Sequence, residues 1–228
     1  ESCRSINDLK NGERGNLKIG ASQTIGIYLL PRVLSLAAKN YPQIHFKVQV
    51  NSTRIIAKNL INKEIDVAIV GGEIPNDFKK NMKVETFLSD EFRLIVGKSN
   101  PFRNQQSITK PELYDLNFIS LTANSTIRQF IESILSQNDI EPKKFKIIME
   151  LNSIEAIKTA VSLGLGAAFV SSSAIEKEIE LKKIQIIKIE NIQIARQIFL
   201  ISHLETYKSK AFQFFYNELV RLKNNLSN

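Results

Sequence analysis

The chain has 228 residues, of which 43% are hydrophobic and 24% charged. This composition is typical of a globular protein with a real core, and the length suits one large domain or two small lobes. No apolar run is long enough to span a bilayer, so we expect no membrane partner. The single cysteine, Cys3, excludes an internal disulfide and favours a reducing compartment.

The formal net charge of +8 raises nucleic acid or acidic ligands as partners. The basic residues form no stripe, however. Lys79-Lys80, Lys143-Lys144 and Lys182-Lys183 are scattered among acids such as Glu176. We interpret this charge as solvated surface, so this part of the chain need not touch DNA itself.

The first half predicts alternating strands and helices. Residues 1–16 are polar and indicate the end of a helix and a linker. Hydrophobic periodicity then predicts strands at 17–21, 45–50 and 66–70, with helices at 25–40 and from Thr53, a candidate N-cap, to 62. Strands separated by helices of this length imply parallel crossovers and an α/β sheet.

The same pattern returns in the second half of the chain. It predicts strands at 118–121, 146–151 and 167–170, with helices at 127–137 and 154–163. Further strands are expected at 91–98, 184–189 and 197–201, where they would join the halves as hinge strands. A last helix at 208–223 is expected to pack on the first lobe through Phe212, Phe215, Leu219 and Leu222. The predicted fold is α/β, with two Rossmann-like lobes.

Small and hydroxyl-bearing residues follow each predicted strand. In the first half they form the turns Ser22-Gln23-Thr24, Ser52-Thr53 and Gly71-Gly72-Glu73. In the second half they form Asn124-Ser125-Thr126, Asn152-Ser153 and Ser171-Ser172-Ser173. Ligands of open α/β sheets lie outside the carboxyl ends of the strands, and helix N-termini favour negative charge. We therefore predict a cleft between the lobes that binds a small anion.

Several of these side chains have two interpretations. Ser22, Thr24 and Thr53 would either cap helices or line the cleft. Arg128 and Arg54 stand in the first turn of a helix, where the dipole disfavours a cation. Each would therefore bind an anionic ligand, pair with a nearby carboxylate or point into water.

We also expect two further groups of residues to contribute to the cleft. Glu73 would pair with one of these arginines when the cleft is empty. Ser171-Ser172-Ser173 would close the far wall of the cleft, or its later serines would cap a helix at 174–178.

The sequence resembles a known family at an ordered set of positions. The leader Asp8–Glu13 resembles the end of a linker helix, and the segments that follow resemble the effector-binding domain of LysR-type transcriptional regulators. These segments are Gly15–Gly20 through Tyr28–Pro31, Tyr41-Pro42, Ile65–Ile69, Asp90–Val96 with Asn100–Phe102, and Gly164–Ala168. Ser22–Gly26 with Val70–Pro75, and Asn124–Arg128, are similar to the subgroup that controls Rubisco operons and carbon fixation in cyanobacteria, algal plastids and autotrophic bacteria.

This resemblance implies a type II periplasmic-binding-protein-like fold. The lobe bounds would be 1–16 for the end of the linker helix, 17–91 with 196–228 for lobe I, and 92–195 for lobe II. It also implies a winged helix-turn-helix upstream, a homodimer or homotetramer on promoter DNA, and a location in the cytoplasm or the plastid stroma. A small anionic metabolite, an organic acid or a sugar phosphate, would bind between the lobes.

The family's pocket positions map onto Ser22, Gln23, Thr24, Ser52 and Thr53. The remaining turns add the candidate ligand residues Gly72, Glu73, Ser125, Thr126, Arg128, Asn152 and Ser171.

Signals for catalysis are poor. The two histidines, His45 and His203, lack metal-ligand spacing, and the chain contains no G-x-S-x-G or phosphate-binding glycine motif. We expect no enzyme, no cofactor and no metal site. The alternative function is a transport-type solute-binding protein of the same fold, which an upstream signal peptide would support and an upstream helix-turn-helix would exclude.

Overall fold

The computed structural model describes residues 15–204 and 209–226. The chain forms two compact units. Unit 1 contains the described residues up to Ser89 and from Gln197 onward, and unit 2 runs from Asp90 to Arg196. The expected lobe boundaries followed residues 91 and 195, whereas the observed ones follow residues 89 and 196. The chain passes from one unit to the other within strands β4 (Met82–Gly97) and β10 (Ile194–His203).

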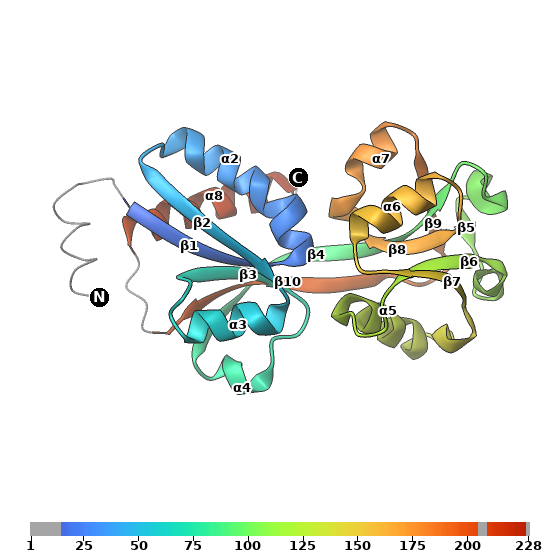
Figure 1. Cartoon of the computed structure of the whole chain (residues 1–228), viewed down its shortest axis with the longest axis horizontal. Coiled ribbons are helices and arrows are strands. Elements are labelled where there is room, and N and C mark those ends of the chain that lie inside the picture. Colours follow the sequence, from blue (N-terminus) through green and yellow to red (C-terminus); the bar gives the residue numbers. More distant parts are fainter. Residues whose placement is uncertain (1–14, 205–208, 227–228) are drawn as a thin grey trace. The chain divides into compact units, whose positions relative to one another are not determined.

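Unit 1 is built on a mixed sheet in which the strands follow the order β2-β1-β3-β10 (Figure 1). β1 (Gly15–Ser22) pairs in parallel with β2 (Ile44–Asn51) and with β3 (Val67–Gly71), and β10 pairs antiparallel with β3. A π-helix, η1 (Ile25–Leu29), continues into α2 (Leu30–Asn40). The remaining helices of unit 1 are α3 (Thr53–Ile61), α4 (Asn76–Lys79) and α8 (Lys210–Leu226).

The two faces of this sheet carry separate apolar layers because side chains alternate along a strand. Leu17, Ile19 and Ala21 of β1 join the layer that contains Leu30 and Val33 of α2 and the buried face of α8. The expected face of that last helix is confirmed: its buried members are Phe212, Phe215, Leu219 and Leu222. The opposite layer joins Ala68 and Val70 of β3 to α3. Each polar turn is thereby fixed at the end of a packed strand.

Unit 2 repeats this plan. β6 (Asn117–Leu121) pairs in parallel with β7 (Lys146–Leu151) and β8 (Ala167–Ser171), while β4 pairs antiparallel with β8 and β9 (Ile184–Ile189). The short β5 (Ser107–Ile108) pairs with β9. The α-helices are α5 (Thr126–Gln137), α6 (Ile154–Ser162) and α7 (Glu176–Glu180). Short 3₁₀ turns cover Pro101–Asn104, Pro111–Asp115, Pro142–Lys144 and Ser172–Ala174.

The helices of unit 2 also cover two apolar layers. Phe92, Leu94 and Val96 of β4 pack with Ile131 and Leu135 of α5. Ile95 packs on the other face with Ile157 and Val161 of α6. Gly97 lets α6 approach β4 closely, since a Cβ atom at Gly97 would lie 2.1 Å from the Val161 carbonyl oxygen.

Several local predictions were wrong. The strand at 184–189 has the expected bounds but lies wholly inside unit 2, so it is not a hinge strand. Gly15 and Asn16 belong to β1 rather than to a linker, and β4 begins at Met82 instead of residue 91. The helix expected at 174–178 is a 3₁₀ turn followed by α7. The expectations for Cys3, for residues 1–14 and for the start of the last helix at 208 lie outside the described residues.

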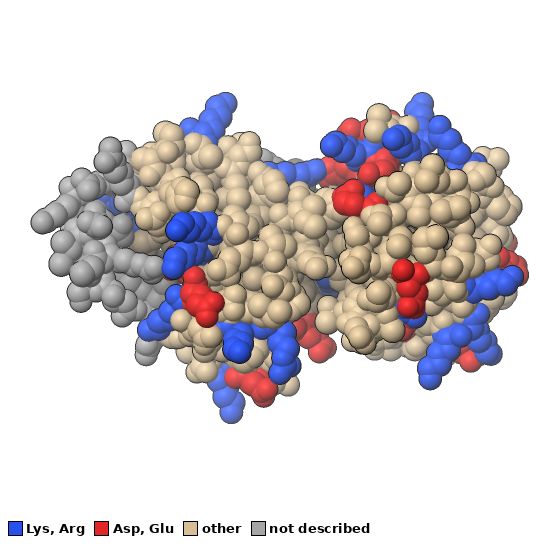
Figure 2. Space-filling view, in the orientation of Figure 1, with Lys and Arg blue, Asp and Glu red and all other residues tan. Residues whose placement is uncertain are grey.

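Charged side chains of both signs occur in each unit on the face drawn in Figure 2, and broad uncharged areas separate them. This distribution agrees with our interpretation of the net charge as solvated surface. None of the helices in the described ranges combines the length and apolar character that crossing a membrane requires.

We predict that Gly97→Ala destabilises the domain by about 2 kcal/mol, because the new methyl group must push α6 away from β4. Urea denaturation of the domain measures this loss. Ser89→Ala, an exposed position on the same strand, is the control and should be close to neutral. Equal stability of the two variants would show that α6 does not pack against β4 as described.

Candidate functional site

The turns at the ends of the unit 1 strands meet at Gly71. The Ser22 hydroxyl oxygen accepts a hydrogen bond from the Gly71 backbone N–H at 3.1 Å. The Thr53 hydroxyl donates to the Gly71 carbonyl oxygen at 3.0 Å. We call Ser22, Thr24, Ser52, Thr53 and Gly71 the turn cluster of unit 1. It joins the end of β1, the start of α3 and the end of β3.

Ser52, not Thr53, is the N-cap of α3. Its side chain accepts from the Ile55 backbone N–H at 3.4 Å, and its own backbone is extended. Thr53 is the first helical residue, and its hydroxyl reaches across to Gly71 instead of capping. The prediction of Thr53 as the cap was therefore wrong by one residue.

Thr24 has a buried hydroxyl with no hydrogen-bond partner among the described residues. The residue is 2% exposed, and its Oγ1 atom is one of three buried side-chain atoms without a hydrogen-bond partner in the described ranges. Thr24 immediately precedes η1 but makes no capping bond. An unsatisfied buried hydroxyl costs about 1–3 kcal/mol, so each example in a folded protein requires an explanation.

The helix that follows Thr24 begins with a π turn. Such turns are rare in proteins, and those that occur are often found at functional sites. The Leu30 N–H bonds to the Ile25 carbonyl, five residues back. Pro31 follows and has no N–H, and in a regular α-helix its ring would clash with the carbonyl four residues earlier. The wider turn relieves this clash.

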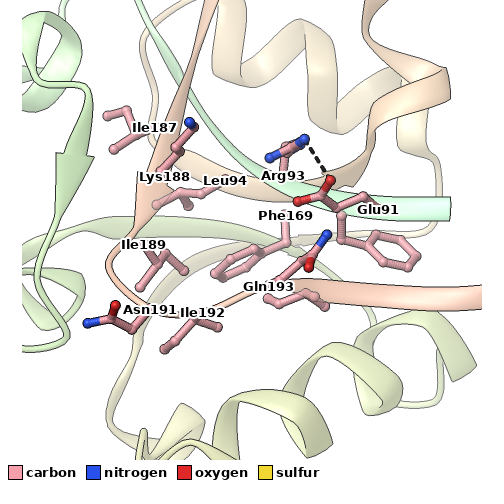
Figure 3. Close-up of a pocket in the computed structure, with 12 residues that line it drawn as sticks. Glu91, Arg93, Leu94, Phe169, Ile187, Lys188, Ile189, Asn191, Ile192 and Gln193 are labelled. Atoms are coloured by element: carbon pink, nitrogen blue, oxygen red, sulfur yellow. Dashed lines mark ion pairs between the residues drawn. The ribbon is translucent and has the colours of Figure 1, made fainter. Parts of the chain in front are cut away.

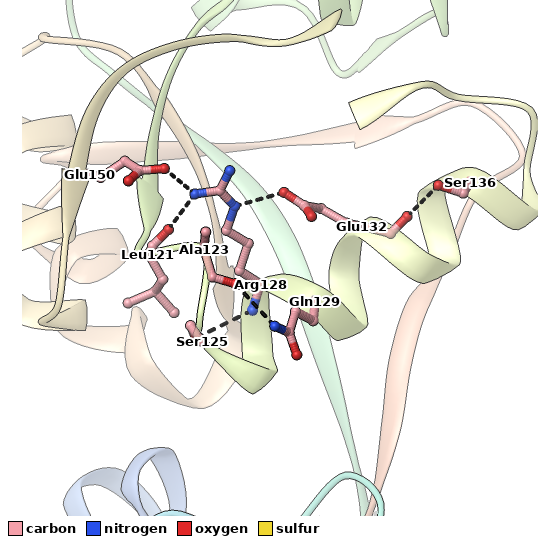
Figure 4. Close-up of polar contacts among 8 residues, drawn as sticks. All are labelled: Leu121, Ala123, Ser125, Arg128, Gln129, Glu132, Ser136 and Glu150. Atoms are coloured by element: carbon pink, nitrogen blue, oxygen red, sulfur yellow. Dashed lines mark hydrogen bonds and ion pairs between the residues drawn. The ribbon is translucent and has the colours of Figure 1, made fainter. Parts of the chain in front are cut away.

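In unit 2, the Arg128 side chain is held by protein groups on three sides (Figure 4). Its Nε donates to Glu132 at 2.7 Å, and Nη1 donates to the Leu121 carbonyl at 2.9 Å and to Glu150. Burial alone would lower the arginine pKa, but the two carboxylates raise the pKa above its ordinary value. Pairing with carboxylates is thus the alternative that the structure shows, and it offsets the unfavourable position in the first turn of α5.

Ser171 also contacts a charged group inside unit 2. Its hydroxyl, which is 1% exposed, donates to Asp90 Oδ1 and lies 2.8 Å from the Ser173 hydroxyl. Asp90 Oδ2 accepts from Arg196 Nε at 3.0 Å. The Arg196 guanidinium lies 4.8 Å from the centre of the Phe92 ring. Burial lowers the pKa of Arg196, and Asp90 partly opposes that shift.

Comparison with known proteins decides the family. The model of the LysR substrate binding domain matches residues 10–223. A "Probable RuBisCO transcriptional regulator" of Phaeodactylum tricornutum is 69% identical over 228 residues, covering 100% of this chain and 74% of the relative. A relative with the same name from Gracilaria tenuistipitata is 49% identical and covers 97% of this chain and 72% of its own.

The chain belongs to the LysR substrate-binding domain family. Among solved structures, the Synechocystis CcmR regulatory domain in complex with 2-PG has a TM-score of 0.80 at 24% identity, covering 93% of this chain and 99% of its own. The QuiR effector-binding domain in complex with shikimate has a TM-score of 0.74 at 21% identity, covering 93% and 98%. These likenesses show that the LysR substrate-binding domain has the expected type II periplasmic-binding-protein-like fold.

Membership of this family also decides between the two functions that the sequence left open, a regulatory domain and a transport-type solute-binding protein. The chain is the effector-binding domain of a LysR-type regulator, because the family model and the relatives' names describe regulators and not transport proteins. Regulator domains of this kind are not an enzyme family. Within residues 15–204 and 209–226, the LysR substrate-binding domain has no group of three or more candidate metal ligands.

The other candidate residues of the LysR substrate-binding domain lie at the surface, bond through their backbone or cap a helix. Gln23, Glu73, Thr126 and Asn152 are exposed. Gly72 has a φ of +82°, and its N–H bonds to the Gln197 carbonyl at 3.2 Å. Ser125 caps α5 by accepting from the Arg128 N–H at 3.4 Å.

The expected pairing of Glu73 with an arginine was wrong for Arg54. No ion pair joins these two residues, and Arg54 is exposed in the described part of unit 1. The first turn of α3 therefore leaves the Arg54 side chain in solvent.

Sequence reasoning missed Asp90, Arg196, Glu132 and Glu150 as partners. Glu132 follows Arg128 by four residues, a helical spacing that favours an ion pair and was available in the sequence. Asp90 and Arg196 are separated by 106 positions and meet through strand pairing alone, so no local signal indicated them.

We predict that Arg196→Met destabilises the LysR substrate-binding domain by about 3 kcal/mol, because Asp90 is left buried without its cation. The double variant Asp90→Leu/Arg196→Met should lose less than Arg196→Met alone, since no buried charge remains. Urea denaturation of Asp90→Leu, Arg196→Met and the double variant measures this. A double variant whose loss equals the sum of the two single losses would contradict the proposed coupling.

We predict that Arg128→Met lowers the free energy of unfolding by about 1 kcal/mol, because Glu132 and Glu150 lose their ion-pair partner and the Leu121 carbonyl loses its donor. Chemical denaturation measures this change, with exposed Lys143→Met as the control. The loss should shrink in high salt as the ion pairs are screened. A loss of the same size at every salt concentration would assign Arg128 a packing role instead.

Proposed function

We propose that this domain senses a small anionic metabolite, an organic acid or a sugar phosphate, at the turn cluster of unit 1, and that the intact regulator controls RuBisCO genes. The relatives' names support the gene target, and the neighbour whose structure is a complex with 2-PG supports an anionic effector. The single observation that carries the site is the buried, unpartnered hydroxyl of Thr24.

The hydrogen-bonding capacity of the turn cluster matches such a ligand. A hydroxyl donates one hydrogen bond and accepts others. Thr24 has its donor free, and Ser22 uses its oxygen as an acceptor for Gly71, which leaves its own proton available. Both groups can donate to an anionic oxygen. Thr53 already donates to Gly71, so it can only accept, and it would suit a ligand hydroxyl.

The backbone at this site adds to the attraction. Helix η1 continues into α2, so the N–H groups that follow Thr24 begin a helix that extends from Ile25 to Asn40. Free N–H groups and the helix dipole stabilise an anion at such an end. Organic acids and sugar phosphates both combine an anionic group with the hydroxyls that Thr53 could bind.

The remaining candidates form the second part of this proposal. Gln23, Ser52, Gly72 and Glu73 would surround the ligand in unit 1, and Ser125, Thr126, Arg128, Asn152 and Ser171 would contact it from unit 2. That the two units share one ligand stays a prediction. Promoter DNA would be contacted through an upstream winged helix-turn-helix in a homodimer or homotetramer, located in the cytoplasm or the plastid stroma.

We predict that Thr24→Val has opposite effects on binding and on stability. We choose 2-phosphoglycolate, an organic acid that carries a phosphate group, as the probe. The isosteric valine would remove a ligand contact, so affinity for 2-phosphoglycolate should fall about tenfold. It also removes an unsatisfied buried hydroxyl, so the free energy of unfolding without ligand should rise by about 1 kcal/mol. Isothermal titration calorimetry and urea denaturation measure the two quantities.

Thr86→Val is the matched control, because Thr86 is an exposed threonine of β4 in unit 1. It should leave both quantities unchanged. Glycolate, which lacks the phosphate group, should bind more weakly than 2-phosphoglycolate to the wild-type domain. Equal affinity of Thr24→Val and wild type for 2-phosphoglycolate would remove Thr24 from the site.

A further inference from the structure

We propose that unit 2 contains a second anion-binding site, separate from the turn cluster of unit 1. Its centre is a cavity of about 350 Å³. The cavity lies between β4, the end of β9 and the start of β10 (Figure 3). All of its lining residues belong to unit 2.

The cavity forms where two strands separate. β4 and β9 pair from Gly97↔Ile184 to Leu94↔Ile187, and the pairing ends there. Beyond this point β9 turns back through Asn191, whose φ is +58°, and the chain enters β10 at Ile194. Beyond that ladder, Glu91–Arg93 of β4 and the turn from β9 to β10 line the gap that forms the cavity.

Two cations line this gap. Continuing the antiparallel register by one step places Arg93 opposite Lys188, and both residues line the cavity. Cations that line the same cavity repel one another. Glu91 neutralises Arg93 through an ion pair of 2.6 Å, whereas Lys188 has no ion-pair partner in the described part of the chain. A bound anion would relieve this repulsion.

The rest of the lining defines the organic part of the ligand. Phe92, Leu94, Phe169 and Ile192 supply apolar and aromatic surface, and the amide of Gln193 projects at the rim. Sites for small molecules combine such an apolar lining with a few polar groups that orient the ligand. The chemistry fits an anion attached to an aromatic or branched aliphatic group, such as an aryl phosphate or aryl carboxylate.

A ligand at this position touches both strands through which the chain leaves unit 2. Glu91 and Phe92 directly follow Asp90 on β4, and Ile194 lies two residues before Arg196 on β10. The Arg196 guanidinium stacks on Phe92, a lining residue. Occupancy of the cavity would therefore act on the buried Asp90–Arg196 pair, which gives the second site a route to regulate the domain.

The test is calorimetric titration of the domain with phenyl phosphate as the probe. Lys188→Gln should weaken binding about fivefold, as expected for one partly solvated charge contact, and Arg93→Gln/Lys188→Gln should weaken it further. Lys143→Gln, an exposed lysine elsewhere in unit 2, should bind like wild type. Phenol, the uncharged counterpart, should bind less tightly than phenyl phosphate.

The variant Thr24→Val separates this site from the proposed effector site. It should retain its affinity for phenyl phosphate, whereas its affinity for 2-phosphoglycolate falls. Loss of phenyl phosphate binding in Thr24→Val, or equal affinity of Lys188→Gln and wild type, would overturn the second site. Either result would leave the test of the turn cluster with 2-phosphoglycolate unaffected.

Discussion

The arrangement of unit 1 depends on how the backbone of Gly71 is held. β1 and β3 pair over three residue positions, from Ile19↔Val67 to Ala21↔Ile69, so the ladder stops before the ends of the two strands. Hydroxyls then replace the ladder: Ser22 binds the Gly71 N–H, and Thr53 binds its carbonyl. These bonds fix the end of β3 against the turn after β1 and against the start of α3. Ser22 lies two residues before Thr24, which immediately precedes η1 and is buried.

The two units share a topology but satisfy the polar groups at their strand ends differently. Unit 1 uses neutral hydroxyls and backbone groups, whereas unit 2 uses the Asp90–Arg196 pair and the carboxylates around Arg128. A buried ion pair is costly to separate because each partner would be left uncompensated. Neutral hydroxyls exchange partners at much lower cost. The ion pairs of unit 2 are therefore costly to rearrange. The hydroxyls of unit 1 are better suited to an exchangeable ligand.

Whether a feature depends on local periodicity or on a distant partner explains how much of the structure could be predicted from sequence. Elements that depend on local periodicity were predicted well: the strands at 146–151 and 184–189 have the observed bounds, and the buried face of α8 follows from helical spacing. Features that depend on distant partners were not. The choice between Ser52 and Thr53 as cap depends on a carbonyl 18 residues away, and the role of β9 depends on which strand it pairs with. Thr24 carried no signal of its unsatisfied state, because a threonine before a helix normally caps it.

The free-energy cost of the unpaired Thr24 hydroxyl limits how far a ligand that pairs with it could shift a conformational equilibrium. A ligand shifts an equilibrium between two states only by the difference in its affinity for them. If the hydroxyl is unpaired without ligand and paired with it, the relief of about 1–3 kcal/mol corresponds to roughly one to two orders of magnitude in that equilibrium. A regulator must release its effector when the metabolite concentration falls, so a change of this size is useful where a much larger one would hold the domain in one state. Under the proposed function, the unpaired hydroxyl of Thr24 would be costly for stability and suited to sensing for the same physical reason.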